Sequence, residues 1–218
     1  MKDEASLEIS EIFYSIQGES SYAGFPCLFF RLAGCNLRCA YCDASYTYEE
    51  PGKPLPISAL LAEAEQYPGC LIEITGGEPL LQEGVYPLMD KLLKAGHKVL
   101  LETNGSLDLA KVPAAVIKIV DLKCPDSGMH EKMNLANLTR LAPHDEIKFV
   151  LSSRRDYNWA KQMIADHELG KKAQLIMSPV VCKLHAADLA AWILADRLPI
   201  RLQLQLHTHL WPDSKRGV

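Results

Sequence analysis

The stretch Leu71–Pro79, with the sequence LIEITGGEP, decides the fold of this chain. Its first residues form a short apolar run, which is typical of a strand covered on both faces. Two glycines, a glutamate and a proline then end the strand in a tight turn. A helical pattern follows over Gly84–Ala95 and stops before Gly96, a residue type that commonly ends helices. The stretch therefore predicts a strand, a turn and a helix in succession.

Further strand–helix units repeat this pattern along the chain. The predicted strands are Leu28–Leu32, Leu71–Thr75, Lys98–Glu102, Val116–Asp121, Glu146–Leu151, Gln174–Pro179 and Arg201–His207. The other predicted helices are Ser58–Gln66, Asp156–His167 and His185–Arg197. Ser58 is the predicted cap of the first of these helices. The alternation predicts an α/β fold with a parallel sheet, whose ligands bind at the carboxyl ends of the strands.

The composition is that of an ordinary globular protein, with 218 residues, 48% of them hydrophobic and 23% charged. This length predicts a single domain over residues 1–218. The formal net charge of −4 shows no basic excess, so we expect no nucleic-acid partner. The acidic start, Met1–Ala5, lacks the apolar core of a secretory signal, and no apolar run approaches the roughly 18 residues of a membrane span. We therefore expect a cytoplasmic protein without a membrane partner.

Three of the seven cysteines lie within one short loop, Gly34–Asp43, with the sequence GCNLRCAYCD. The thiolates of Cys35, Cys39 and Cys42 can converge on one metal centre and leave a fourth position open. One interpretation is a zinc knuckle completed by a histidine or a distant cysteine, because structural zinc binds four ligands. The other is an iron–sulfur cluster with one iron free for a small ligand. The remaining cysteines lie beside apolar runs, and we expect them in the core: Cys27, Cys70, Cys124 and Cys182.

Tyr41, immediately before the last of the three cysteines, favours the iron–sulfur interpretation. Cysteines with this spacing and an aromatic residue at that position resemble the signature of the radical S-adenosylmethionine superfamily. The resemblance implies a 4Fe–4S cluster whose free iron chelates the methionine end of S-adenosylmethionine, and a 5′-deoxyadenosyl radical that forms on reduction. It also implies a partial (incomplete) parallel β/α barrel, covered by fewer than eight helices and open on one side.

The Gly-Gly-Glu-Pro turn of Leu71–Pro79 resembles the second motif of that superfamily, which binds the methionine amino group. From the residues alone it could be a plain strand-to-helix turn, and the polar ends of the later strands could be exposed surface. The resemblance implies instead that these residues surround the cofactor. The implied ligands of S-adenosylmethionine are Tyr41, Asp43, Gly77, Glu78, Glu102, Asn104, Asp121, Lys123 and Ser178.

The two ends of the chain narrow the resemblance. Residues 12–20, IFYSIQGES, precede the first core strand, and the tail combines Arg201–His207, RLQLQLH, with a terminal Arg216–Val218. Over Glu8–Val218 the chain resembles the 7-carboxy-7-deazaguanine synthases. The resemblance implies a lyase of queuosine and deazapurine biosynthesis that acts on 6-carboxy-5,6,7,8-tetrahydropterin. The radical takes a hydrogen atom from the carbon that bears the carboxylate, the pyrazine ring contracts and ammonia leaves.

The same resemblance divides the chain into a substrate-binding segment, residues 8–33, a cluster loop, 34–43, and a closing tail, 199–218. The implied substrate ligands are Ile16, Gln17, Gly18, Glu19, Arg31, Thr75, His207 and Val218. A pterin presents donors that Glu19 can accept and a carboxylate that Arg31 can bind with two parallel hydrogen bonds. From the residues alone, Arg31 could form a surface ion pair, His207 could be a core histidine and Gln17 a turn residue.

The sequence departs from that family at three positions. Ala44 replaces a hydroxyl residue that helps to hold Mg²⁺ in that family, so either Ser45 or water substitutes for it, or Mg²⁺ is weakly bound or absent. Ser20 replaces a glycine, a change that we expect the turn to tolerate. Thr208 stands where we expect a lysine in the tail.

Beyond the pterin, we expect an electron donor such as flavodoxin or ferredoxin and a second copy of the chain in a homodimer. Two other functions stay open. A glycyl-radical-enzyme activase, or another small radical enzyme, shares the cluster and the glycine turn and would need a protein partner. A zinc-binding interaction module would use the cysteines without any reaction.

Overall fold

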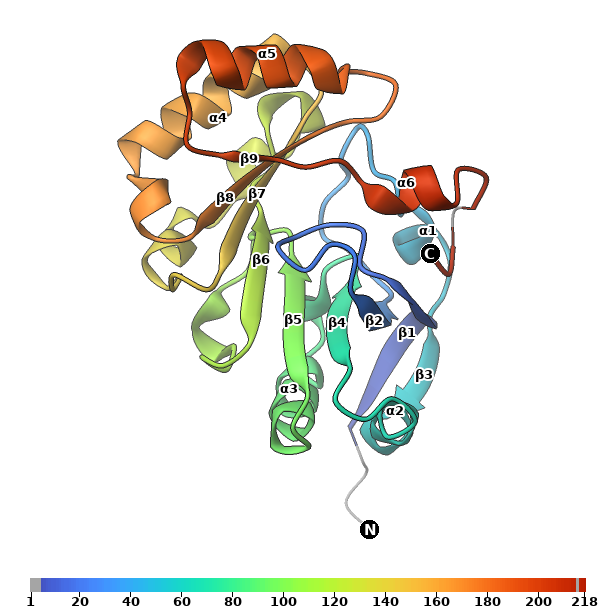
Figure 1. Ribbon diagram of the computed structural model, residues 1–218. Coiled ribbons are helices and arrows are strands. Elements are labelled where there is room, and N and C mark those ends of the chain that lie inside the picture. The colour runs from blue at the N-terminus through green and yellow to red at the C-terminus, as the bar shows by residue number, and fades with distance from the viewer. Residues whose placement is uncertain (1–4, 215) are drawn as a thin grey trace.

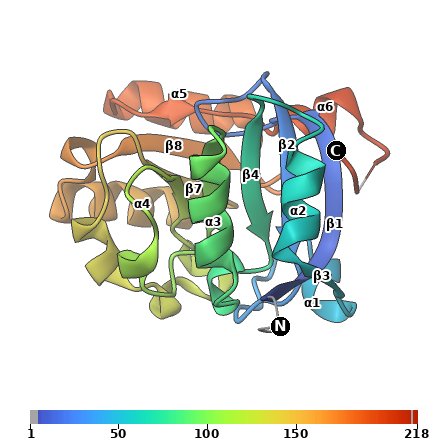
Figure 2. The ribbon, with the colours of Figure 1, turned by 90° about the horizontal axis from the view of Figure 1, so that it is seen from below.

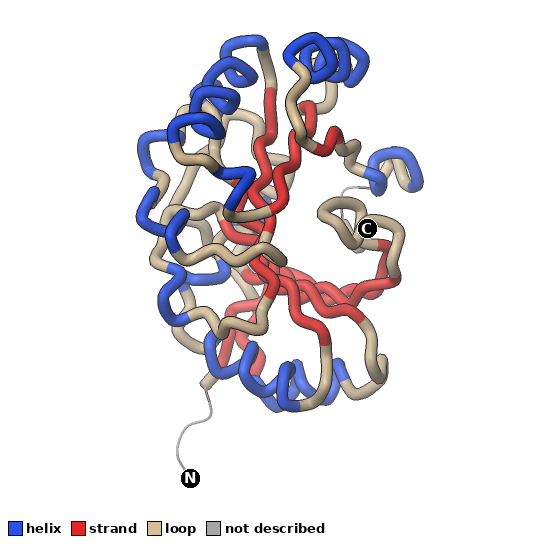
Figure 3. Tube along the Cα trace, turned by 60° about the vertical axis from the view of Figure 1, so that its left-hand side comes forward, coloured by secondary structure: helices blue, strands red, loops and turns tan. Residues whose placement is uncertain are grey.

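The computed structural model describes residues 5–214 and 216–218, and one nine-stranded sheet forms its centre (Figure 1). Across the sheet the strand order is β3-β1-β2-β4-β5-β6-β7-β8-β9. The strands are β1 Ser6–Ile16, β2 Pro26–Leu32, β3 Lys53–Pro56, β4 Leu71–Gly76, β5 Lys98–Thr103, β6 Ile117–Asp121, β7 Glu146–Leu151, β8 Gln174–Pro179 and β9 Arg201–Leu202. Figure 3 shows them as an open arc, with helices along the outer side and the carboxy-terminal segment on the inner side. The predicted α/β fold with an incomplete barrel is confirmed. Residues 1–4, where the sequence predicts no secretory signal, lie outside the described residues.

One strand, β1, runs opposite to the other eight strands of the sheet. β2 and β4 to β9 pair in parallel, as predicted, whereas β1 pairs antiparallel with both β2 and β3. Neither β1 nor β3 was predicted as a strand. β3 has two prolines in four residues, which an edge strand tolerates because only one of its sides pairs.

Helices cover the outer side of the arc. They are α2 Ile57–Ala64, α3 Val85–Lys94, α4 Arg154–Asp166 and α5 Ala186–Asp196, with two short ones, α1 Tyr46–Glu49 and α6 Leu206–Leu210, near the carboxy terminus. Figure 2 shows α2 and α3 side by side near β4. Within the described residues there are six α-helices, fewer than eight as expected. None of these helices is long and apolar enough to cross a membrane.

The element boundaries test the sequence patterns one by one. β7 and β8 begin and end at the predicted residues, and Gly96, at φ 88°, ends α3 in the left-handed conformation that favours glycine. The predicted cap Ser58 is wrong, because α2 begins at Ile57 and extended Pro56 holds the cap position. The last predicted strand is too long. β9 ends at Leu202, and after it the side-chain amide of Gln203 donates to Ser20 O at 2.6 Å and accepts from Ser20 N at 2.7 Å.

The core lies mainly between the sheet and the outer helices. Side chains such as Ile72 and Ile74 of β4 are fully buried against Leu88 and Leu92 of α3. A smaller apolar cluster fills the inner side near the amino ends of the strands and includes Phe29. Cys27 and Cys124 are buried as predicted and Cys70 is half-buried. The prediction is wrong for Cys182, which is exposed in the loop that leads to α5.

Candidate active site

One cavity of about 730 Å³ brings together the predicted site residues. It lies on the inner side of the arc, between the cluster loop, the segment after β1 and the tail. Every predicted residue lines it except Glu78 and Ser178. The residues predicted to bind a cluster, a cofactor and a small substrate therefore share one chamber.

The cluster loop presents its three thiols to this cavity. Gly34, at φ 89°, turns the chain before Cys35. The backbone N–H of Leu37 donates to the sulfur of Cys35 at 3.4 Å, and Cys42 N–H donates to Cys39 O at 3.2 Å. Burial raises the pKa of Cys39 to about 11 against the opposing charge of Lys123, so metal binding there must displace a proton.

The glycine turn after β4 is pressed against the cluster loop. A Cβ on Gly77 would lie 2.0 Å from the carbonyl oxygen of Gly34 and 2.8 Å from Cβ of Cys35. A Cβ on Gly76 would lie 2.2 Å from the carbonyl oxygen of Leu32. Both positions need glycine because backbone meets backbone here. The turn forms a cradle beside Cys35 that fits the predicted cluster.

Glu78 supports this cradle from behind. Its carboxylate accepts hydrogen bonds from the Thr103 hydroxyl at 2.9 Å, Asn104 N at 2.7 Å and Leu80 N at 3.0 Å, and it is fully buried. It therefore fixes the end of β5, where Asn104 turns its side chain toward Cys35 and Asn36. Burial raises the pKa of Glu78 while these hydrogen bonds oppose the shift.

The predicted cofactor ligands after β6 include an atom with an unmet hydrogen-bonding need. Oδ2 of Asp121 accepts from Lys123 Nζ at 2.7 Å, whereas Oδ1 is buried and has no partner within residues 5–214 and 216–218. An unpartnered buried carboxylate oxygen on a cavity wall suits a ligand that carries hydroxyl donors. This fits the ribose of S-adenosylmethionine. Ser178 Oγ is also unpartnered in this part of the chain but lies outside the cavity.

The segment after β1 lies against the tail. A Cβ on Gly18 would lie 2.5 Å from Nδ1 of His207, so only glycine lets the histidine approach. Leu206 N–H donates to Gly18 O at 2.9 Å. Ser20 is buried, and its φ of 63° lies in the left-handed region that favours glycine. The turn thus accommodates serine in place of the expected glycine, but with backbone strain.

A layer of buried charges lies below these residues, and two of its members, Glu73 and Lys148, were not predicted as site residues. Lys148 of β7 forms ion pairs with Glu102 of β5 and, at 2.6 Å, with Glu19, while Glu73 of β4 accepts from the side chain of Gln17. The signal was present in the sequence, since Glu73 is the one charge in an otherwise mainly apolar strand and Lys148 stands between apolar residues in another. Gln17 is thus more than a turn residue, because its side chain is buried and bonded.

Arg31 occupies a second polar corner with the tail. Its Nε lies 2.6 Å from Glu11, which also accepts from the Tyr46 hydroxyl at 2.7 Å and from Gly217 N–H at 3.1 Å. The Arg31 side chain is only 17% exposed and lines the cavity, so this is no surface ion pair. Arg216 stacks on the Tyr46 ring at 4.2 Å, which holds the chain end over the cavity.

The residues at the predicted Mg²⁺ position do not fit that ion. Ala44 has no ligand atom, and the hydroxyl of Ser45 donates to Glu49 at 3.1 Å. Within the described ranges, no three His, Cys, Asp or Glu side chains converge closely enough for a single metal ion. The sulfurs of Cys35, Cys39 and Cys42 are no exception, since cluster cysteines each bind a different iron.

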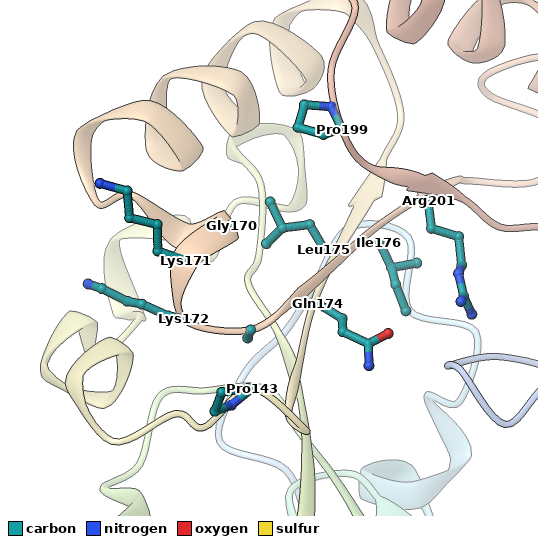
Figure 4. Close-up of a pocket in the computed structure, with 10 residues that line it drawn as sticks. Pro143, Gly170, Lys171, Lys172, Gln174, Leu175, Ile176, Pro199 and Arg201 are labelled. Carbon is teal, nitrogen blue, oxygen red and sulfur yellow. The ribbon is translucent and has the colours of Figure 1, made fainter.

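A second cavity, of about 370 Å³, lies at the amino ends of β8 and β9 (Figure 4). None of the predicted site residues lines it. Figure 4 shows Lys171 and Lys172 pointing away from Arg201, so its positive charges do not converge on one ligand. The larger cavity is therefore the candidate active site.

Comparison with known proteins agrees with this geometry. Residues 31–162, which include the cluster loop and the glycine turn, match the radical SAM superfamily. A 7-carboxy-7-deazaguanine synthase of Chlorobaculum tepidum is 47% identical over 222 residues and covers all of both chains. Another, of Koribacter versatilis, is 46% identical and covers 97% of this chain and 100% of its own.

The chain belongs to the 7-carboxy-7-deazaguanine synthase family. It is thus a radical SAM enzyme, and the family implies a 4Fe–4S cluster and S-adenosylmethionine. The crystal structure of QueE from Escherichia coli has the same fold, with a TM-score of 0.77 at 24% identity over 93% of this chain and 95% of that one. Streptococcus suis SuiB has the fold more distantly, with a TM-score of 0.58 at 14% identity over 84% of this chain and 49% of SuiB. Family membership leaves the activase and zinc-module alternatives without support.

Proposed function

We propose that this chain converts 6-carboxy-5,6,7,8-tetrahydropterin into 7-carboxy-7-deazaguanine and releases ammonia. One observation carries the proposal: the cluster cysteines and the groups suited to a pterin line the same cavity. The names of the full-length relatives support this product over those of other radical enzymes. The enzyme then serves queuosine and deazapurine biosynthesis.

Cys35, Cys39 and Cys42 would hold the 4Fe–4S cluster and leave one iron open to S-adenosylmethionine. When bound, the two groups supply a radical that takes a hydrogen atom from the substrate. Asp121 would accept from the cofactor through its free Oδ1, and the ion pair with Lys123 orients that carboxylate. Glu78 would act on the cofactor only through the backbone of Asn104 that it fixes. Tyr41, Asp43, Gly77 and Glu102 remain predicted ligands along the wall, and Ser178 one outside it.

The chain's own groups would bind and enclose the pterin. Arg31 keeps its two terminal nitrogens for the substrate carboxylate because Glu11 takes only Nε. The charge layer below would face the amino-pyrimidine edge, and Thr75 the ring carbons. Residues 8–33 would thus bind substrate, 34–43 the cluster, and the tail, 199–218, would exclude water through His207 and Val218.

Mg²⁺ has no part in this proposal, since the residues at Ala44 and Ser45 do not fit it. The reductant would be a low-potential flavodoxin or ferredoxin, and Arg38, exposed on the cluster loop, would present a positive charge to an acidic donor. The homodimer and the cytoplasmic location stay predictions.

The test is turnover under anaerobic conditions with dithionite, S-adenosylmethionine and carboxytetrahydropterin. We expect 7-carboxy-7-deazaguanine by mass spectrometry, and 5′-deoxyadenosine without this product would refute the substrate. Cys39→Ala should lose both the brown colour and the activity. Cys70→Ala, a free thiol outside the cavity, is the matched control and should keep both.

A further inference from the structure

Glu73 is a buried carboxyl group on the cavity floor to which the proposed function assigns no role of its own. It lies in the middle of β4, two residues before Thr75 on the same face, and is 3% exposed. Strand residues at this depth are otherwise apolar on both sides of it, with Phe29 opposite on β2. A carboxyl group in such a place costs free energy unless hydrogen-bond donors meet it.

The charges around Glu73 do not balance. Glu19 and Glu102 share the single cation Lys148, which bonds to both. The guanidinium of Arg31 also faces Glu73 but is paired with Glu11. Within the described part of the chain, the Glu73 carboxyl forms no ion pair and its side-chain partner is the neutral amide of Gln17.

Burial with so few donors raises the pKa of the Glu73 carboxyl before a ligand binds. Burial, and next the charge of Glu102, hold the pKa of Glu73 well above its usual range, although Lys148 and Arg31 act in the opposite direction. Glu19 on the loop after β1 and the thiol of Cys27 on β2 also face this carboxyl. The floor thus offers a carboxyl that a ligand with N–H donors would ionise.

The walls beside Glu73 define the shape of that ligand. Phe29, stacked on Phe13 with ring centroids 4.7 Å apart, and Ile119 of β6 both line the cavity with apolar surface. Two apolar walls and a carboxyl below suit the edge of a flat heterocycle. Neighbouring N–H and NH₂ donors on a ring match the two oxygens of a carboxylate.

We propose that Glu73 is the specificity-determining residue for the 2-amino-4-oxo edge of the pterin, and that Gln17 orients it. The inference rests on the proposed function and adds to it which residue recognises the 2-amino group of the pterin. The ring N3–H and the amino N–H donate to the two carboxylate oxygens. The proton that Glu73 holds in the empty site leaves to solvent, and no covalent bond changes.

The test compares two stable ligands on the reconstituted holoenzyme with S-adenosylmethionine. One is 6-carboxypterin, and the other is 6-carboxylumazine, which has an oxygen in place of the amino group. We expect the pterin to bind about 100-fold more tightly, as sites that hydrogen-bond a polar group reject analogues that lack it. Calorimetry in buffers of different ionisation enthalpy should show about one proton released with the pterin. Equal affinities, or no proton release, would overturn the proposal even without any variant.

Glu73→Gln should remove the preference, because pterin affinity falls about 100-fold while lumazine affinity changes little. It should also abolish the proton release, which a purely structural role would leave in place. Glu146→Gln is the matched control: Glu146 is equally buried but lies outside the cavity, where it accepts from Ser21 N at 2.9 Å. Glu73→Asp, which keeps the charge, should retain preference for the pterin at reduced affinity. A Glu73→Gln enzyme that still prefers the pterin would overturn the proposal.

The outcomes separate this inference from the proposed function. If the wild-type enzyme neither binds 6-carboxypterin nor forms 7-carboxy-7-deazaguanine, the function itself is wrong. If the wild type turns over and Glu73→Gln keeps its discrimination, the function stands and another residue reads the edge.

Discussion

Gly77→Ala tests whether the glycine turn and the cluster loop form one rigid unit. The added Cβ would lie 2.0 Å from the Gly34 carbonyl oxygen, where ordinary contact begins near 3.4 Å. The backbone of Gly34 must therefore move by more than an ångström, and it would carry Cys35 with it. Overpacking of this kind costs about 1–3 kcal/mol, and a misplacement of about 1 Å at a reacting centre can cost about 100-fold in rate.

The assay for this variant has three readouts: iron and sulfide per chain, thermal unfolding, and 5′-deoxyadenosine formation. We expect incomplete cluster loading and at least a 100-fold loss of cofactor cleavage. Gly170→Ala is the control, since its Cβ would meet only a side-chain carbon of Leu175 at 3.7 Å, and it should stay within about 0.5 kcal/mol of wild type. A Gly77→Ala enzyme with normal cluster content and activity would refute the reasoning.

Four further predictions follow from other sites. Ser20→Gly should raise the free energy of unfolding by about 1 kcal/mol, measured by urea denaturation, because the residue sits at φ 63°. Lys148→Met should lower it by about 3–5 kcal/mol, since two largely buried carboxylates lose their cation; a neutral result would contradict the charge layer. Burial raises the pKa of Glu102, but the charge of Lys148 outweighs burial and lowers this pKa from 4.5 to about 2. The ionised carboxylate therefore stabilises the fold fully above pH 4.5, and this stabilisation disappears as the pH falls toward 2. Glu102→Gln should make the free energy of unfolding less dependent on pH in that window. Wild-type turnover should be unchanged by EDTA, and an EDTA-sensitive wild type would show that a metal site exists. Ala44→Thr restores the hydroxyl at this position and should gain Mn²⁺ binding detectable by electron paramagnetic resonance.

The sequence patterns predicted the fold where a pattern has one physical cause. Glu146–Leu151 and Gln174–Pro179 became strands with the expected ends because each is mainly apolar and begins at a polar residue. β1 was not predicted because its burial alternates only over its first residues, and most of the later ones are only partly buried. β3 escaped because two prolines in four residues argue against a strand everywhere except at an edge.

The candidate site likewise contains residues that the sequence predicted and residues that it did not. The cysteines and glycines of the two loops were predicted because their spacing resembles that of two motifs of the radical S-adenosylmethionine superfamily. Glu73 and Lys148 were missed, because one charge in a strand does not reveal which charge it will meet across the sheet. Cys182 was misplaced in the core because its neighbours are apolar, yet the loop around it turns outward at φ 66°.

The loop after β1 closes the arc with side chains where a full barrel would have a ladder of paired strands. Ser20 and Ser21 reach the far strands through Gln203, Gln174 and Glu146. This seam between the loop and the far strands opens when a few hydrogen bonds break, whereas separating two paired strands breaks a cooperative array of backbone hydrogen bonds. Opening this seam would therefore leave the paired strands, and the loop that carries the cluster cysteines, intact.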